Sequence, residues 1–219
     1  RYLDVIPEDG GCDEGVGYWN MAGGALLDCL EILEHVTGGK MNFRNNSKIR
    51  NMMDYPRKAY IGHRWCVNFA DCDAKPELNG ERLRKAGEML DLPELVTFGA
   101  AFRMTPGMHL SDTPQMARLL NTLFHDSPVI PEQERTGDEW LPDLQVRILR
   151  GNRMTLICKG GHNAESHNHN DVGSFMLYAD GAPEVADAGN MIYTAKTFSE
   201  KRYEIWNIRS AYHNVPMIG

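Results

Sequence analysis

The hydrophobic spacing of the chain changes from helical to strand-like near residue 130, and this change limits the folds open to it. In residues 17–36 the leucines recur at spacings of three and four, which predicts an amphipathic helix. Thr37-Gly38-Gly39 predicts where that helix ends. Similar patterns predict four more helices, at residues 47–60, 79–90, 92–103 and 113–124. Ser47 and Thr113 are expected at two of the N-caps, and the short linkers predict antiparallel helix hairpins.

The second part of the chain carries the alternating and β-branched patterns of strands. Strands are expected at residues 144–149, 153–159, 172–178 and 184–187. Ala179-Asp180-Gly181-Ala182 predicts a hairpin turn between the last two. Helices followed by antiparallel strands predict an α+β architecture with two domains.

The connection between these parts is expected in residues 124–142, which hold three prolines and a charged middle. We therefore divide the chain into a helical domain at residues 1–130 and a strand domain at residues 131–219.

The composition excludes two classes of partner. The chain has 219 residues, and its 23 lysines and arginines against 30 acids give a formal net charge of −7. This balance argues against non-specific binding of nucleic-acid phosphates. No apolar stretch reaches the roughly 20 residues that a membrane-spanning helix needs. We therefore expect neither a nucleic-acid nor a membrane partner.

The five cysteines are an odd number and form no CxxC pair. This pattern predicts free thiols and argues against a disulfide framework or a cysteine zinc cluster.

Three of the eight histidines lie within eight positions, in Gly160-Gly161-His162-Asn163-Ala164-Glu165-Ser166-His167-Asn168-His169. If residues 166–171 are extended, His167 and His169 point to the same side, roughly 6–7 Å apart. Two such imidazoles suit a shared metal, or one ligand and one proton-transfer group. With a carboxylate such as Asp187 they could hold zinc or iron. The alternative is that these residues are polar strand ends satisfied by hydrogen bonds, and spacing alone leaves the choice open.

Longer motifs at both ends of the chain are similar to those of one family. Residues 159–219, with GGHNAESHNHND, DAGN and AYHN, resemble the β-sandwich domain of heparinase II/III polysaccharide lyases. The loop Asp9-Gly10-Gly11-Cys12-Asp13-Glu14-Gly15-Val16-Gly17-Tyr18 resembles the family's loop at the edge of its (α/α) toroid. The resemblance implies part of an (α/α) toroid followed by part of an antiparallel β-sandwich.

The resemblance implies β-elimination in a polysaccharide that contains uronic acid, leaving a 4,5-unsaturated uronate. Such a reaction needs a neutralised substrate carboxylate, a base for the C5 proton and an acid for the leaving oxygen. Tyr18 and His167 match the family's tyrosine and histidine that share the proton transfers. Glu14, Tyr193 and His162 are expected to bind substrate. Lys196 and Arg202 could add positive charge, although single basic residues usually lie in solvent.

The family's metal site matches His169, Asp187 and His213, and zinc is the expected ion. Its expected role is structural, since an elimination consumes no water. Two alternatives stay open: a non-catalytic, metal-stabilised carbohydrate-binding domain, and a zinc-dependent hydrolase that uses His167, His169 and Asp187.

Several properties are left undecided by the sequence. The chain resembles an internal fragment of a larger lyase, because the family's carboxylate-neutralising residue would precede Arg1 and the strands are too few for a sandwich. Activity of such a fragment alone is doubtful. The glycan is unspecified, and a homodimer is one open assembly state. Family members are often periplasmic or secreted bacterial enzymes, yet the cysteine pattern also allows the cytoplasm.

Overall fold

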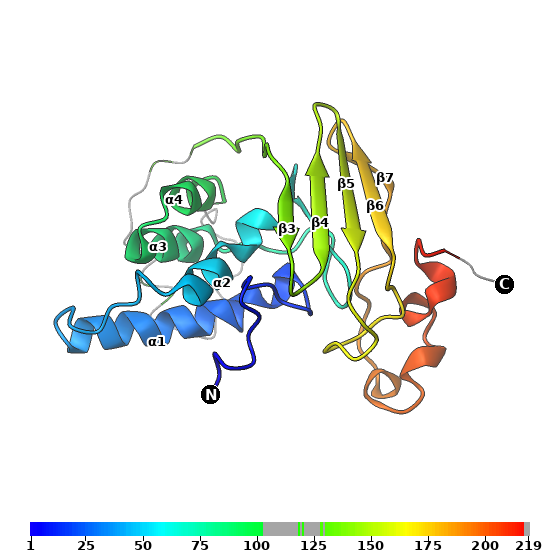
Figure 1. Cartoon of the computed structure of the whole chain (residues 1–219), viewed down its shortest axis with the longest axis horizontal. Helices are drawn as coiled ribbons and strands as arrows, with labels where there is room; N and C mark the ends of the chain where they lie inside the picture. The colour runs from blue at the N-terminus through cyan, green and yellow to red at the C-terminus, as the bar shows by residue number, and fades with distance from the viewer. Residues whose placement is uncertain (103–117, 119, 121–127, 129, 217–219) are drawn as a thin grey trace.

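The structure is a computed structural model that describes residues 1–102, 118, 120, 128 and 130–216. A helical part is followed by a five-stranded sheet and by short 3-10 helices near the C-terminus (Figure 1). The helical part contains η1 (Val16–Asn20), α1 (Gly23–Val36), α2 (Ser47–Lys58), α3 (Gly80–Leu90) and α4 (Pro93–Ala100). These helices confirm four of the five predicted from the sequence. The fifth, at residues 113–124 with Thr113 as N-cap, lies outside the described residues apart from 118 and 120.

The N-cap of α2 and the continuity of the first helix differ from the prediction. The N-cap of α2 is Asn46 and not Ser47, because the Asn46 side chain accepts a hydrogen bond from the Ile49 amide at 3.0 Å. The helix predicted over residues 17–36 is divided into η1 and α1. Trp19 anchors the first segment, since its indole nitrogen donates to the Met52 carbonyl at 2.9 Å. At the other end, Gly38 has a φ of 60°, as expected for a helix stop.

The large sheet is antiparallel, with strand order β3-β4-β5-β6-β7. Its strands are β3 (Glu139–Leu141), β4 (Val146–Arg150), β5 (Met154–Lys159), β6 (Phe175–Ala179) and β7 (Ala182–Val185). The register pairs Ile148 with Ile157, and both are fully buried. β6 begins three residues later than predicted because the Ser174 amide closes a turn onto the Asp171 carbonyl at 2.9 Å.

Two strand pairings were not predicted. β3 lies inside the segment expected to be only a connection, and it pairs with β4. A small hairpin of β1 (Tyr60–Gly62) and β2 (Trp65–Cys66) interrupts the helical part. Its turn places His63 and Arg64 at positive φ. The loop that follows this hairpin carries Asp71.

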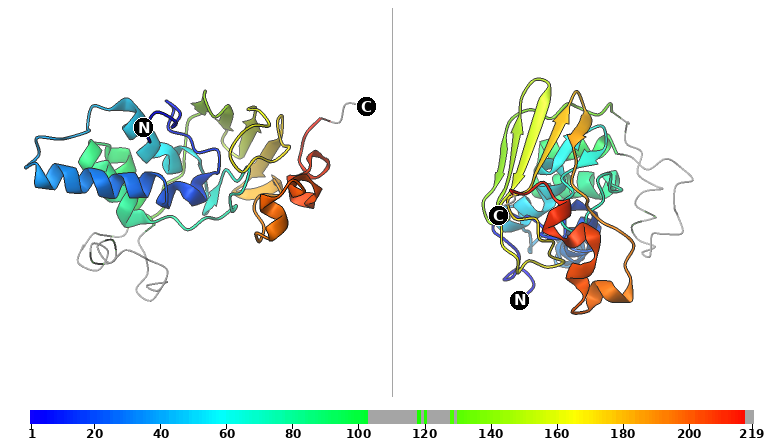
Figure 2. Two further views of the ribbon diagram at one scale, coloured as in Figure 1. Left: turned by 90° about the horizontal axis from the view of Figure 1, so that it is seen from below. Right: turned by 90° about the vertical axis from the view of Figure 1, so that its right-hand side faces the viewer.

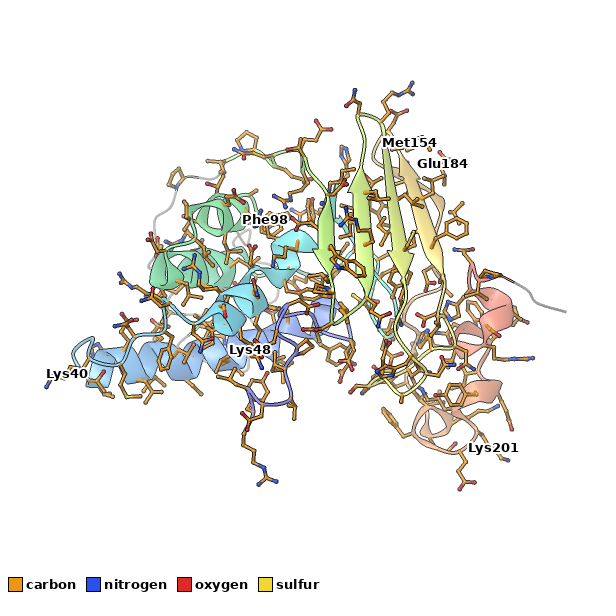
Figure 3. All side chains as sticks on the ribbon, viewed as in Figure 1. Lys40, Lys48, Phe98, Met154, Glu184 and Lys201 are labelled. Atoms are coloured by element: carbon orange, nitrogen blue, oxygen red, sulfur yellow. The ribbon has the colours of Figure 1, made fainter. Side chains whose placement is uncertain are left out.

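The helical part and the sheet share one buried core. Leu27 and Met53 of the helices belong to the same apolar cluster as Ile157 and Met176 of the sheet. The left view in Figure 2 places the helices on one side of the sheet and the C-terminal 3-10 helices on the other. Figure 3 draws the side chains of the described residues, including those between the two parts.

Hydrogen bonds also cross the junction. Arg150 of β4 donates to the carbonyls of Lys58 and Tyr60, each at 2.9 Å. The Asp9 carboxylate accepts from the amides of Asp143 and Leu144 at 2.7 and 3.0 Å. These bonds fix the first loop of the chain against the sheet.

Some of the expected architecture stays a prediction. The described residues form one five-stranded sheet and a two-stranded hairpin, so the toroid, the sandwich and the division near residue 130 remain to be tested. All five cysteines are free, as predicted. None of the described helices has the length and apolar character needed to cross a membrane.

Candidate active site

The candidate site lies where the loop of residues 160–174, which joins β5 to β6, meets the helical part. Met154 and Glu184 mark one end of the sheet in Figure 3, and this loop leaves the opposite end. The Ser166 amide donates to the Asp13 carboxylate at 2.9 Å. This contact attaches the loop directly to the segment that precedes η1.

Tyr18 is placed by the tight turn before η1. Gly15 has a φ of 88°, and a side chain there would come within 2.4 Å of Cys72 Cβ. Only glycine therefore suits both the conformation and the space. The turn leaves the Tyr18 hydroxyl in a short hydrogen bond with the Tyr193 hydroxyl. The Tyr18 ring centroid lies 5.8 Å from that of His167.

Residues 166–171 are not extended, so the condition under which His167 and His169 would share one side of a strand is not met. The segment turns at residues 166–167, and His167 has a φ of 50°. The two rings still meet one carboxylate, that of Asp71. His167 Nδ1 lies 2.6 Å from Asp71 Oδ2, and His169 Nε2 lies 2.9 Å from Asp71 Oδ1.

Asp71 is the buried centre of the site, and it was not identified from the sequence. Its side chain is 3% exposed. Besides the two histidines it accepts a hydrogen bond from the Tyr193 hydroxyl at 3.0 Å. Burial alone would raise the pKa of Asp71, but hydrogen bonds from His169, His167 and Tyr193 outweigh it and lower that pKa well below its ordinary value. Asp71 is therefore a carboxylate across the neutral pH range.

Tyr193 joins Tyr18 to this carboxylate. Its hydroxyl lies within hydrogen-bond distance of Tyr18, Asp71 and His167 Nδ1, the last at 3.2 Å. Burial, followed by the hydrogen bonds with Tyr18 and Asp71, raises the pKa of Tyr193 well above its ordinary value. Tyr193 therefore keeps its proton.

Of the other two residues expected to bind substrate, Glu14 lies at the site and His162 does not. Glu14 Oε2 lies 3.8 Å from His167 Nε2. Burial raises the pKa of Glu14, and the nearby His167 partly opposes this rise. His162 is exposed, and its Nδ1 accepts from the Ala164 amide of its own turn at 3.2 Å. The structure brings Glu14 to the site and does not bring His162 to it.

Arg202 is not a solvent-exposed residue, contrary to the expectation from its sequence context. Its side chain is 14% exposed and lies 3.4 Å from Asp71 Oδ2. It donates to the carbonyls of His167, Asn168 and Thr197 at 2.8, 3.3 and 3.2 Å. Arg202 thus pins the turn at His167. Lys196 is 42% exposed and pairs with Glu204.

The three expected metal ligands lie near one another. His213 Nδ1 is 2.9 Å from Asp187 Oδ2, and the rings of His169 and His213 are 5.4 Å apart. Burial raises the pKa of Asp187. The hydrogen bond from His213 lowers this pKa by a larger amount, so the net shift is downward. Burial lowers the pKa of His213. The hydrogen bond with Asp187 raises this pKa by a larger amount, so the net shift is upward.

The donor atoms of these three residues suit a metal ion, but their arrangement in the structure is not that of a bound site. Within the described ranges, no three His, Cys, Asp or Glu side chains stand in a geometry that would hold an ion. The donor set of two imidazoles and a carboxylate suits zinc. Two buried ring nitrogens, His169 Nδ1 and His213 Nε2, have no hydrogen-bond partner. Such orphaned nitrogens are the groups that a bound ion would engage.

An apolar groove adjoins the site on the helical side. A cavity of about 560 Å³ is lined by Glu14, Tyr18 and residues of α1 such as Leu26. Phe198, which is 69% exposed, lies with its ring 5.3 Å from Tyr193 and 6.3 Å from His167. The network of Tyr18, Tyr193 and His167 therefore adjoins both a groove and an exposed aromatic ring.

Comparison with known proteins supports the class of fold. Residues 133–218 match the family model described as Heparinase II/III-like, C-terminal. The resemblance drawn from the sequence motifs is thereby confirmed for this part of the chain. The sequence matches none of the curated proteins with which it was compared.

Two solved structures of heparinase III share the fold. The structure titled "Crystal Structure of Heparinase III" has a TM-score of 0.63 and 17% identity, over 97% of this chain and 32% of that chain. The one titled "Heparinase III-BT4657 gene product" has a TM-score of 0.60 and 16% identity, over 97% of this chain and 30% of that chain. The chain thus spans about a third of the length of either protein.

Proposed function

We propose that the chain carries part of the catalytic site of a polysaccharide lyase that cleaves a uronic-acid-containing glycan by β-elimination. One observation carries the proposal. The Tyr18 hydroxyl, from the helical part, and the His167 imidazole, from the loop after β5, join one hydrogen-bonded network beside an open groove. The heparinase II/III-like match of residues 133–218 supports the same class of reaction.

The reaction needs two proton transfers, and the site offers two groups for them. A base removes the C5 proton, the C5 electron pair forms the C4–C5 double bond, the C4–O4 bond breaks, and the leaving oxygen receives a proton. Tyr18 and His167 are the groups we assign to these transfers. Tyr193 is unsuited to act as the base because its pKa is raised. Its proposed role is to bind substrate and hold Tyr18 in place, with Glu14 nearby.

We further propose that His169, Asp187 and His213 bind zinc. When bound, the ion would supply positive charge that fixes the strand-end loops around Asp187 and His213. The orphaned nitrogens of His169 and His213 support this assignment. No proton transfer depends on the ion, since both groups that we assign to proton transfer lie outside the trio. The substrate partner is an acidic polysaccharide.

The test is to incubate the full-length protein that carries this chain with heparan sulfate, chondroitin, hyaluronan and alginate, and to follow the ultraviolet absorbance of a conjugated unsaturated uronate. Tyr18→Phe and His167→Ala should each lower kcat by about 100- to 10,000-fold, the usual range for losing a general acid or base. Tyr212→Phe is the matched control, because Tyr212 is 53% exposed and stacks only on Trp206 among the ring contacts described.

Two results would replace this proposal with another. Binding without any cleavage, unchanged in the Tyr18→Phe and His167→Ala variants, would indicate a carbohydrate-binding domain. Cleavage without the absorbance of an unsaturated product would indicate a hydrolase.

A further inference from the structure

Asp71 contacts both His167, the proposed proton-transfer group, and His169, a proposed metal ligand. It lies in the loop after β2, and both of its oxygens are engaged. Oδ2 accepts from His167, Tyr193 and Arg202, and Oδ1 accepts from His169. Its side chain is 3% exposed, so water cannot replace these partners.

An ionised carboxylate only accepts hydrogen bonds, and this fixes the proton position on His167. Because Nδ1 lies 2.6 Å from Asp71 Oδ2, Nδ1 carries the hydrogen in the neutral ring. Nε2 then holds the free electron pair. It lies on the side of Glu14, whose oxygen is 3.8 Å away and so beyond hydrogen-bond distance. The nitrogen that faces the groove side is therefore the one able to take a proton.

The same reasoning gives His169 the opposite tautomer. Its Nε2 lies 2.9 Å from Asp71 Oδ1, so Nε2 carries the hydrogen and Nδ1 holds the free electron pair. Nδ1 is the atom that is buried without a partner. A histidine whose other ring nitrogen donates to a carboxylate is the usual arrangement at metal sites.

Asp71 also sets the direction of the tyrosine hydrogen bonds. Tyr193 donates its hydroxyl hydrogen to Asp71, so its oxygen is left to accept from Tyr18. The Tyr18 hydrogen then points into the network. Tyr18, Tyr193 and Asp71 form one ordered chain of donors that ends on the carboxylate.

The backbone on both sides of this contact is held in an unfavourable conformation. Ala70, the residue before Asp71, has a φ of 57°, and His167 has a φ of 50°. Residues other than glycine adopt this region at a cost. Such strain persists where the surrounding structure requires it, and it is common at functional sites.

We propose that Asp71 is a positioning residue that fixes the Nδ1–H tautomer of His167 and the Nε2–H tautomer of His169. One carboxylate from the helical part thereby orients both the proton-transfer imidazole and the metal-binding imidazole. The kinetic part of this inference rests on the proposed lyase function, whereas the tautomers do not.

The test combines histidine nitrogen NMR with kinetics on the same protein. In ¹⁵N-labelled protein at about pH 8, where an unperturbed histidine is neutral, His167 should carry its hydrogen on Nδ1. In Asp71→Asn the side-chain amide can donate to Nδ1 and move the hydrogen to Nε2. We expect kcat to fall by at least about 100-fold with KM changed less than about threefold, as when a base is held in the wrong tautomer.

Asp54→Asn is the matched control. Asp54 is also buried and ion-paired, with Arg57 on α2, so its loss reports the general effect of neutralising such a pair. It should lower the thermal midpoint and leave the His167 tautomer unchanged.

Two outcomes would overturn the proposal. In the first, wild-type His167 carries its hydrogen on Nε2. This result is measured on the wild type and does not depend on the folding of any variant. In the second, folded Asp71→Asn retains kcat within about threefold. If no polysaccharide is cleaved, the lyase proposal fails and the wild-type tautomer still decides the role of Asp71.

Discussion

Lys159 provides a strict test of how the histidine loop is held. Its side chain is 3% exposed, and its ammonium group lies 2.7 Å from Asp171 Oδ1 and 2.9 Å from Glu165 Oε2. Asp171 is fully buried. These two acids flank His167 and His169 in the sequence, so the lysine ties both ends of the histidine segment to the end of β5.

Lys159→Met should destabilise the protein strongly because the Asp171 charge would stay buried without its partner. Removing one member of a buried ion pair costs about 3–5 kcal/mol. In a chain of this size, about 1 kcal/mol shifts Tm by roughly 2–4 °C. We therefore expect Tm to fall by about 6–20 °C, measured by circular dichroism.

The pKa of Lys159 predicts a matching pH dependence. Burial lowers this pKa, but Asp171 and Glu165 more than compensate, so the net shift is upward from 10.5. A raised lysine pKa gives stability that is fully present below the unfolded value and is lost as pH rises through the folded one. The difference in Tm between wild type and Lys159→Met should therefore shrink only above about pH 10.5.

The double variant Lys159→Met/Asp171→Asn separates the buried charge from lost packing. It should recover at least about half of the destabilisation, because no uncompensated carboxylate remains at position 171. A Tm loss below about 2 °C in the single variant, or a double variant as unstable as the summed single variants, would refute this account of the loop.

Three further predictions follow from the site and the helix ends. A chelator should lower Tm in the wild type but not in His213→Ala; an equal effect on both would exclude the proposed zinc site. Phe198→Ala should raise KM by about 2- to 10-fold with kcat unchanged, since an exposed ring can stack on a sugar; an unchanged KM would place Phe198 outside the sugar path. Asp91, which ends α3 with a φ of 55°, should tolerate glycine with a gain of about 0.5–1 kcal/mol in urea unfolding, whereas a loss would mean that its side chain is needed.

Much of the fold could be predicted because local spacing determines it. The leucine stripe of α1 and the apolar runs of β4 and β5 each lie within one continuous segment. β3 was missed because its three residues lie among prolines and charges, and its pairing with β4 comes from the tertiary structure. The turn at His167 was missed for a similar reason. A left-handed histidine is imposed by its contacts and not by local preference.

The site could be predicted only where a motif marked it. The histidine segment and the first loop led to Tyr18 and His167, which the structure places with ring centroids 5.8 Å apart. Asp71 stands in an ordinary segment, Phe69-Ala70-Asp71-Cys72, and nothing local distinguishes it. Its partner His167 is 96 positions away. Only the folded chain reveals such a contact.

The hydrogen bond between Tyr18 and Tyr193 spans 175 positions, which has a consequence for how activity is lost. The loops that carry the two tyrosines can separate while the shared core keeps the helices and strands in place. Under mild denaturant, catalysis should therefore disappear at a lower concentration than the far-ultraviolet signal of either part. A probe that measures the separation of these two rings would report closure of the site loops, which neither secondary structure nor core packing measures.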